Sequence, residues 1–250
     1  MTSLLFASLL AAPLATGIAS DGPFEYKHGS ETMQGHLVTP QTTAKRPLVL
    51  IVHDWDGVDA YEIGRARQTA AELDAVALAV DVYGKETRPK TPAENGQFAG
   101  KFYADRALFR GRLQAAYDAG IKLDSVDPSK VIIMGYCFGG AAALELARSG
   151  ANLVGTVSFH GGLSTPLPAN EGTVKGRVLV FHASNDPVVP RDQFNAFLDE
   201  CRNAKLQSEV VVFNLTAHSF TKPGGRDYSA EADRRSWKLF KDFFVEVTGT

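Results

Sequence analysis

A cysteine stands among glycines where an expected strand meets an expected helix. Residues 135–140 read GYCFGG; they follow the apolar run 131–134 and precede an Ala-rich helical stretch. In a G-x-nucleophile-x-G turn the bend is so tight that the flanking positions can hardly carry side chains. The helix that starts after the turn favours a thiolate through its dipole and its free N–H groups. The motif therefore predicts Cys137 as the nucleophile of an acyl transfer, with a buried structural cysteine as the alternative.

Two possible partners of this cysteine follow it in the chain. Asp186 lies in a turn-rich segment after the expected strand 178–182, and His218 lies in the loop after the expected strand 209–213. Each alone is a weak indication, because an Asp before Pro is often a turn residue and a lone loop histidine is often solvated. Together they give the order nucleophile, acid, histidine that such sites require. We therefore expect Cys137, Asp186 and His218 to form a catalytic triad.

The loop after the expected strand 47–52 reads HDWDG. In this architecture that loop supplies one backbone N–H to the oxyanion of the reacting carbonyl, and the residue after the nucleophile supplies the other. We therefore expect the N–H groups of Trp55 and Phe138 to form an oxyanion hole, each contributing roughly 3 to 4 kcal/mol. The H-D-x-D spacing matches no established set of metal ligands, so we expect neither a metal nor a cofactor. His160 and His182 also end strands and are expected to support the site.

Apolar runs alternate with segments of helical periodicity from Pro23 onward, and this pattern predicts the fold. Residues 24–27 and 32–38 are expected to form a hairpin. Further strands are expected at 47–52, 75–82, 130–134, 153–159, 178–182 and 209–213, and helices at about 59–74, 101–119, 138–148, 191–203 and 229–247, with a loop at 84–96. Parallel neighbours need crossover helices, so we expect an α/β fold with a mostly parallel sheet covered on both faces. Ligands bind such sheets at the carboxyl ends of the strands.

Composition sets limits on organisation and partners. The chain has 250 residues, 44% of them hydrophobic and 22% charged, which is enough to form a globular core without disulfides or metals. A formal net charge of -2 excludes a general attraction to nucleic acid or to anionic membranes. We therefore expect residues 20–250 to form one domain, a monomer that acts on a small molecule. Cys137 and Cys201 could be two thiols or one disulfide.

The first 19 residues are expected to lie outside this domain. Residues 3–19 form an uncharged apolar run that ends in small residues before Ser20, which is typical of a signal peptide. No Lys or Arg precedes the run, so a cytoplasmic protein with an N-terminal helix on the domain is the alternative. The run is too short and Pro-interrupted for a comfortable membrane span, and no other segment is long and apolar enough.

The segments GYCFGG, SNDPVVP, AHSF and HDWDG, taken together, resemble the dienelactone hydrolase family of α/β-hydrolases. The likeness extends over about residues 24–247. It implies the α/β-hydrolase fold, a Cys-Asp-His triad at Cys137, Asp186 and His218, and hydrolysis of an ester or lactone through a thioester. The family tends to carry a Glu in the HDWDG loop, where it holds the thiol in a resting state. Asp54 stands at that position and is one methylene shorter, so its reach to Cys137 is open.

Two further positions bear on the substrate. Members of the family that act on dienelactone typically present an Arg after the histidine to bind the substrate carboxylate, and this chain has Lys222, which cannot form the bidentate pair. Arg106 resembles a residue often seen in broader relatives, or is a surface helix charge. A thiol acyltransferase or peptidase on the same scaffold, and a binding protein without turnover, stay open as alternatives. A disulfide between Cys137 and Cys201 would silence the nucleophile.

Overall fold

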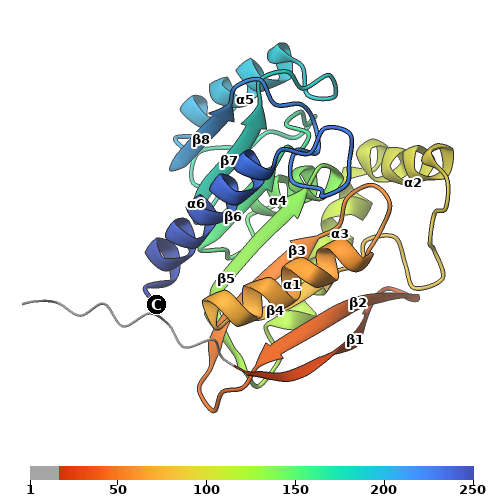
Figure 1. Ribbon diagram of the computed structural model, residues 1–250, viewed down its shortest axis with the longest axis vertical. Coiled ribbons are helices and arrows are strands. Elements are labelled where there is room, and N and C mark those ends of the chain that lie inside the picture. Colours follow the sequence, from red (N-terminus) through yellow and green to blue (C-terminus); the bar gives the residue numbers. More distant parts are fainter. Residues whose placement is uncertain (1–16) are drawn as a thin grey trace, which may run out of the picture.

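The computed structural model describes residues 17–250. Its strands are β1 (Ile18–His28), β2 (Glu31–Pro40), β3 (Arg46–Val52), β4 (Val76–Val80), β5 (Val126–Tyr136), β6 (Gly155–Phe159), β7 (Arg177–Ala183) and β8 (Ser208–Phe213). They form one sheet in the order β1-β2-β4-β3-β5-β6-β7-β8 (Figure 1). β2 pairs antiparallel with β1 and with β4, and all other neighbours are parallel. The expected mostly parallel sheet with an N-terminal hairpin is confirmed.

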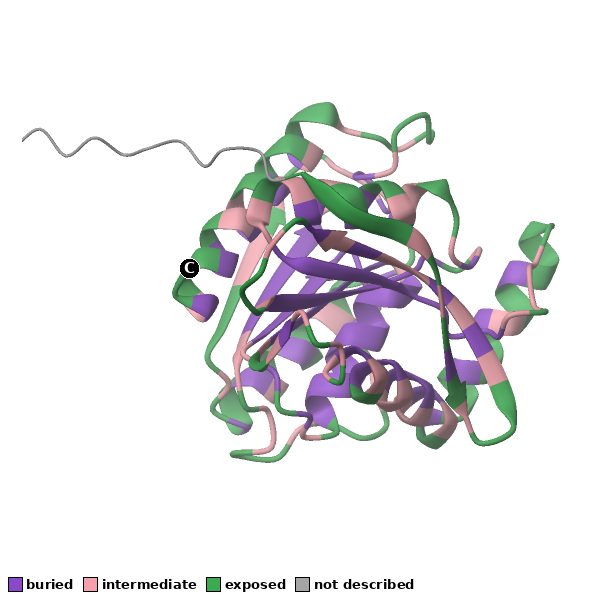
Figure 2. Cartoon of the chain, turned by 90° about the horizontal axis from the view of Figure 1, so that it is seen from below, coloured by how far each residue is buried: buried purple, intermediate pink, exposed green. Residues whose placement is uncertain are grey.

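Helices cover both faces of this sheet. In the described residues they are α1 (Ala60–Leu73), α2 (Pro92–Ala104), α3 (Arg106–Gly120), α4 (Phe138–Arg148), α5 (Arg191–Asn203) and α6 (Ala230–Thr248). α1 and α6 share one apolar core with the sheet, whereas α3, α4 and α5 cover the opposite face, with α2 against α3 (Figure 1). Figure 2 shows the central strands buried between the helical layers. This explains why β3 and β4 are continuous apolar runs.

One expectation about the helices is wrong. The segments expected as a loop at 84–96 and a single helix at 101–119 contain two helices, α2 and α3, which meet at Asp105. α2 begins early because Thr91 and Glu94 form a capping box and Pro92 occupies the first turn. α3 begins anew because the Asp105 side chain accepts a hydrogen bond from the Leu108 N–H. Helical periodicity alone does not show such a break.

The N-terminal expectation falls mostly outside the described residues. Residues 1–16 are not described, and Ile18 and Ala19 form the exposed start of β1, where Ile18 pairs with Pro40. β1 and β2 are longer than expected because their backbone pairing continues beyond the alternating pattern that marked the hairpin. Among residues 17–250, no helix is both long and apolar enough to cross a membrane.

The topology brings four loops to one edge of the sheet. β3, β5, β7 and β8 are parallel, so their carboxyl ends point the same way. Asp54, Cys137, Asp186 and His218 each lie a few residues beyond the end of one of these strands. Residues far apart in the sequence can therefore form one site at this edge.

Candidate active site

Cys137 sits in a strained turn between β5 and α4. Its φ is 50° and its ψ is -110°, a positive-φ conformation that residues other than glycine seldom adopt. The turn also packs closely against β3: a Cβ atom on Gly139 would lie 2.1 Å from the carbonyl oxygen of Val52. A Cβ atom on Gly135 would lie 2.2 Å from the carbonyl oxygen of Gly139. Gly139 is therefore needed for the turn to approach β3, and Gly135 is needed for the end of β5 to approach the start of α4.

The structure brings Cys137, His218 and Asp186 together. The His218 Nε2 atom lies 2.9 Å from the Cys137 Sγ atom, and its Nδ1 atom lies 2.8 Å from Asp186 Oδ2. The other oxygen of Asp186 accepts hydrogen bonds from the N–H groups of Val188 and Val189, at 2.8 and 3.0 Å. These bonds hold the carboxylate in place, so that it orients the imidazole with Nε2 toward the sulfur. Such an arrangement can take a proton from the thiol and return it to a leaving group.

The thiol is held in its protonated form in this arrangement. Burial raises the pKa of Cys137 well above its ordinary value, and the adjacent Asp54 carboxyl raises the pKa further through its charge and a hydrogen bond. The N–H of Phe138 contacts the sulfur and acts in the opposite direction, but burial outweighs it. The expected lowering of the pKa by the helix start is therefore not the net result. The shorter Asp54 side chain is close enough to the thiol to act on its pKa.

Asp54 also contacts one of the two expected oxyanion donors. The N–H of Trp55 donates to Asp54 Oδ1 at 2.6 Å, so this donor is already engaged. The Trp55 carbonyl accepts a hydrogen bond from the Tyr83 hydroxyl at 2.8 Å, and the Asp54 N–H donates to the buried Glu62 carboxyl at 3.2 Å. These bonds fix the loop after β3 beside Cys137. Burial raises the pKa of Asp54, with the nearby Asp56 acting in the same direction.

The comparisons with known proteins agree with this geometry. The family model described as "Dienelactone hydrolase family" matches residues 33–248. The chain belongs to this family of ester and lactone hydrolases. The expected family and α/β-hydrolase fold are thereby confirmed.

Similar proteins include two solved structures and one sequence relative. A dienelactone hydrolase-like promiscuous phosphotriesterase, P91, from metagenomic libraries is 35% identical, with 92% of this chain and 99% of that chain covered and a TM-score of 0.85. The structure named m3DLH is 32% identical, with coverage of 92% and 98% and a TM-score of 0.87. A protein of Aquifex aeolicus that is provisionally named a carboxymethylenebutenolidase is 24% identical, with 88% of this chain and 96% of the relative covered.

The two remaining site candidates of this dienelactone hydrolase family member, Lys222 and Arg106, differ in how far the protein itself engages them. The Lys222 ammonium is 2.7 Å from Asp56 Oδ2 and 3.7 Å from Asp59 Oδ2. Arg106 is buried, so the interpretation as a surface charge is wrong. Its guanidinium lies over the Tyr103 ring, donates to the Ser164 carbonyl at 3.3 Å and stands 4.0 Å from Glu145. Lys222 is therefore engaged by the protein itself, whereas the Arg106 Nε and Nη1 atoms are buried without a hydrogen-bond partner.

His160 lies next to Cys137 and links the turn around it to Thr221 through hydrogen bonds. His160 accepts a hydrogen bond from the Cys137 N–H at 3.2 Å through Nδ1, and its Nε2 atom lies 2.8 Å from Thr221 Oγ1. Burial lowers the pKa of His160 well below its ordinary value, so the ring is neutral. The expected supporting position of His160 agrees with these contacts. Thr221 and Tyr83 were not foreseen; Tyr83 could have been, because it follows the carboxyl end of β4.

Three further expectations concern a disulfide, His182 and a metal. Cys137 and Cys201 are both free, and Cys201 is buried in a separate apolar cluster beneath α5, which excludes the disulfide. His182 stacks on Phe194 with ring centres 4.5 Å apart, and it lines a cavity together with Asp186. Over residues 17–250, no cluster of His, Cys, Asp and Glu side chains is arranged to hold a metal ion.

Proposed function

We propose that this protein hydrolyses a carboxylic ester or lactone through a Cys137 thiolate and a thioester intermediate. The single observation that supports it best is the chain of contacts from Asp186 through His218 to the Cys137 sulfur, at 2.8 and 2.9 Å. A base within this distance of a nucleophile, itself oriented by a carboxylate, is the arrangement that nucleophilic catalysis needs. Membership of the dienelactone hydrolase family supports the same reaction.

The first half of the reaction forms the thioester. His218 Nε2 accepts the thiol proton, and the sulfur attacks the substrate carbonyl carbon. The electron pair of the C=O π bond then moves onto the carbonyl oxygen. The N–H groups of Phe138 and Trp55 then stabilise this oxyanion, which requires Asp54 to release the Trp55 N–H. Collapse of the intermediate expels the alkoxide, which takes the proton from His218.

The second half releases the acid. Water gives a proton to His218 Nε2 as its oxygen attacks the thioester carbonyl, and collapse of this intermediate expels the Cys137 sulfur, which regains the proton. In a lactone the alcohol stays attached to the acyl group, so the product is a single hydroxy acid. No step of this scheme needs a group outside the chain other than water.

Asp54 sets the resting state in this scheme. Its carboxyl contacts the thiol and the Trp55 N–H at the same time, so the nucleophile stays protonated while an oxyanion donor is occupied. A substrate carbonyl that displaces Asp54 from Trp55 also moves the negative charge away from the sulfur. Activation of the thiol and formation of the oxyanion hole are thereby coupled.

The test is a panel of simple esters and lactones on the wild type, Cys137→Ala and the matched control Cys201→Ala. We expect the wild type and the Cys201 variant to turn over at least one ester or lactone, and Cys137→Ala to lose roughly 10³-fold or more while staying folded. Peptide mapping by mass spectrometry after rapid acid quenching should show an acyl group on Cys137, and hydroxylamine should remove it by cleaving the thioester. Equal turnover by wild type and Cys137→Ala contradicts the proposal.

The same panel addresses the alternatives. It includes a peptide, an amine acceptor and a neutral phosphotriester, the last because P91 is a promiscuous phosphotriesterase. Preferential turnover of the peptide or transfer to the amine would favour a peptidase or acyltransferase. Slow, equal alkylation of Cys137 and Cys201 by iodoacetamide, together with no turnover, would favour a binding protein.

Export stays a separate proposal. We propose that residues 1–19 direct export and are removed, on the ground of their uncharged apolar run and the small residues before Ser20. The mass of the mature protein from its native source tests this. A mature chain that begins at Ser20 supports export, whereas a chain that retains residues 1–19 contradicts it.

A further inference from the structure

Three aspartates crowd the loop beside the nucleophile. Asp54, Asp56 and Asp59 lie within six residues between β3 and α1. Asp54 contacts the Cys137 thiol, and Asp56 is close enough to Asp54 to raise the pKa of its carboxyl. A carbonyl carbon that reacts with Cys137 must therefore come close to this group of acids.

Lys222 is the cation that faces these acids, and it is already paired. Its ammonium is 2.7 Å from Asp56 and 3.7 Å from Asp59, and its side chain is 29% exposed. Within residues 17–250, Asp54, Asp56 and Asp59 form no ion pair with any Lys or Arg other than Lys222. One cation among three acids leaves an excess of negative charge, so Lys222 has little attraction left for a substrate carboxylate.

Arg106 and Arg65 are two further cations, and both are buried. The Arg106 guanidinium lies against Tyr103 and donates to the Ser164 carbonyl, and it is 8% exposed. Arg65 pairs with Asp233 on α6 and donates to the Thr221 carbonyl. Arg65 is therefore paired, whereas the Arg106 Nε and Nη1 atoms are buried without a hydrogen-bond partner, and Glu145 lies 4.0 Å from Nε.

Exposed aromatic surface lies beside the same acids. Trp55 is 39% exposed and Tyr103 is 38% exposed, and the Tyr103 ring packs edge-on against Phe138 with centres 5.6 Å apart. Trp55 directly follows Asp54, and Tyr103 lies on α2, which packs against α3. They offer contact area to an apolar group but no charge.

We propose that the substrate is an uncharged ester or lactone with an apolar group, and that the Asp54, Asp56 and Asp59 side chains around the paired Lys222 exclude substrates that carry a carboxylate. This rests on the proposed hydrolase function and specifies its substrate class. A carboxylate brought to Cys137 loses hydration and meets an excess of like charge, whereas an uncharged group meets only the aromatic rings.

The first test compares two aryl esters that differ by one charge. Methyl 4-acetoxybenzoate is neutral, and 4-acetoxybenzoate carries a carboxylate; each kcat/KM is divided by the rate of hydrolysis by hydroxide. At pH 7.5 we expect the wild type to favour the neutral ester by at least about tenfold. Equal rates, or a preference for the anionic ester, overturn the inference while leaving the hydrolase function intact.

A second test does not depend on turnover. It can therefore contradict the exclusion of carboxylates separately from the proposed hydrolase function. Iodoacetamide and iodoacetate alkylate thiols by the same chemistry, and only the second is anionic. Peptide mapping gives the alkylation rate of Cys137, and a small free thiol gives the reference ratio. We expect Cys137 to disfavour iodoacetate at least about tenfold relative to that reference. A ratio equal to the reference, or above it, overturns the inference.

Variants that change one charge test whether the loop between β3 and α1 causes the preference for neutral over anionic compounds. Asp56→Asn removes one acid and frees Lys222, so we expect it to raise the anionic-to-neutral ratio roughly tenfold in either test. Lys222→Gln should lower the ratio, and it serves as a second variant if Asp56→Asn does not fold by circular dichroism. Asp242→Asn removes an equal charge from the exposed pair with Lys238 on α6 and should leave the ratio unchanged. Identical ratios in all four proteins contradict the role of the loop.

Discussion

The Asp54 carboxyl lies close enough to the Cys137 thiol to raise the pKa of that thiol, although one residue follows β3 and the other follows β5. The same Asp54 carboxyl accepts the Trp55 N–H at 2.6 Å, and the same thiol lies 2.9 Å from His218 Nε2. The thiol therefore has His218 Nε2 as a possible proton acceptor, while the charge of Asp54 opposes loss of that proton. Movement of a single carboxylate can change both the charge beside the nucleophile and the supply of oxyanion donors.

Asp54→Asn should lower the pKa of the Cys137 thiol. The Asp54 charge opposes formation of the thiolate, so its removal favours the thiolate, while the amide oxygen can still accept the Trp55 N–H. Alkylation by iodoacetamide should become severalfold faster near neutral pH, and its pH–rate curve should move to lower pH. Asp242→Asn, on the far exposed face of α6, is the control. An unchanged or higher midpoint for Asp54→Asn would contradict this role.

Asp186→Asn should cost activity without loosening the turn. The Asn side-chain oxygen can still accept the N–H groups of Val188 and Val189, but its NH2 group would face His218 Nδ1 and favour the wrong tautomer. We expect a loss of roughly 10³- to 10⁴-fold in kcat for the best ester substrate. The thermal midpoint should change little. A variant that is both active and stable would mean that Asp186 does not orient the histidine.

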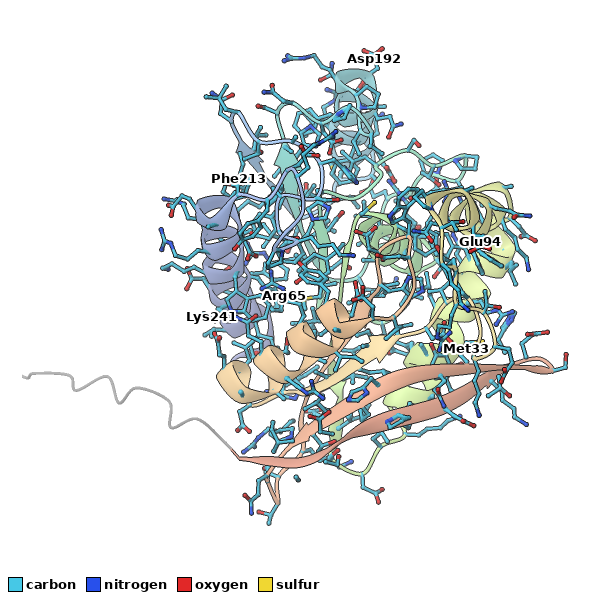
Figure 3. The ribbon with its side chains drawn as sticks, turned by 45° about the vertical axis from the view of Figure 1, so that its right-hand side comes forward. Met33, Arg65, Glu94, Asp192, Phe213 and Lys241 are labelled. Atoms are coloured by element: carbon cyan, nitrogen blue, oxygen red, sulfur yellow. The ribbon has the colours of Figure 1, made fainter. Side chains whose placement is uncertain are left out.

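Arg65→Ala should destabilise the protein far more than Arg67→Ala on the same helix. Arg65 extends from α1 toward α6 (Figure 3). There it pairs with Asp233, and its guanidinium lies over the rings of Tyr61 and Trp237. Loss of one partner of a buried ion pair costs about 3 to 5 kcal/mol, whereas the exposed Arg67 pair contributes about 0 to 1 kcal/mol. Urea unfolding of both variants measures the difference. Equal midpoints would show that the buried pair does not join α1 to α6.

The triad could be located from the sequence because its information is local. Cys137, Asp186 and His218 each follow a run of apolar residues that is long enough to identify a buried strand. Parallel strands then place the three loops at one edge of the sheet. The order of Cys137, Asp186 and His218 in the chain therefore predicts that the three side chains meet. Helix α4 is expected at 138–148 and is found there. The glycine-rich turn marks its start, and the Ala-rich stretch that follows marks its extent.

What could not be predicted depends on contacts between distant residues. The pairing of Lys222 with Asp56 joins positions 166 apart in the sequence, and no local pattern shows that the ammonium is occupied. The net rise in the pKa of Cys137 depends on burial and on Asp54 together, whereas the sequence showed only the favourable helix start. The break at Asp105 was missed because a capping aspartate in a helical pattern also suits an exposed helix position.

Gly139→Ala should disrupt the turn that holds the nucleophile, whereas Gly96→Ala should be harmless. A Cβ atom on Gly139 would lie 2.1 Å from the Val52 carbonyl oxygen and 2.6 Å from that of His53; both are backbone atoms of the central sheet region, which cannot move aside. We expect a loss of about 3 kcal/mol in unfolding free energy and reduced alkylation selectivity at Cys137. Gly96 lies inside α2 with open space around its Cβ position, so alanine there should add about 0.5 to 1 kcal/mol. Thermal unfolding of the two variants measures both effects, and similar midpoints would mean that β5 and α4 can separate from β3 without cost.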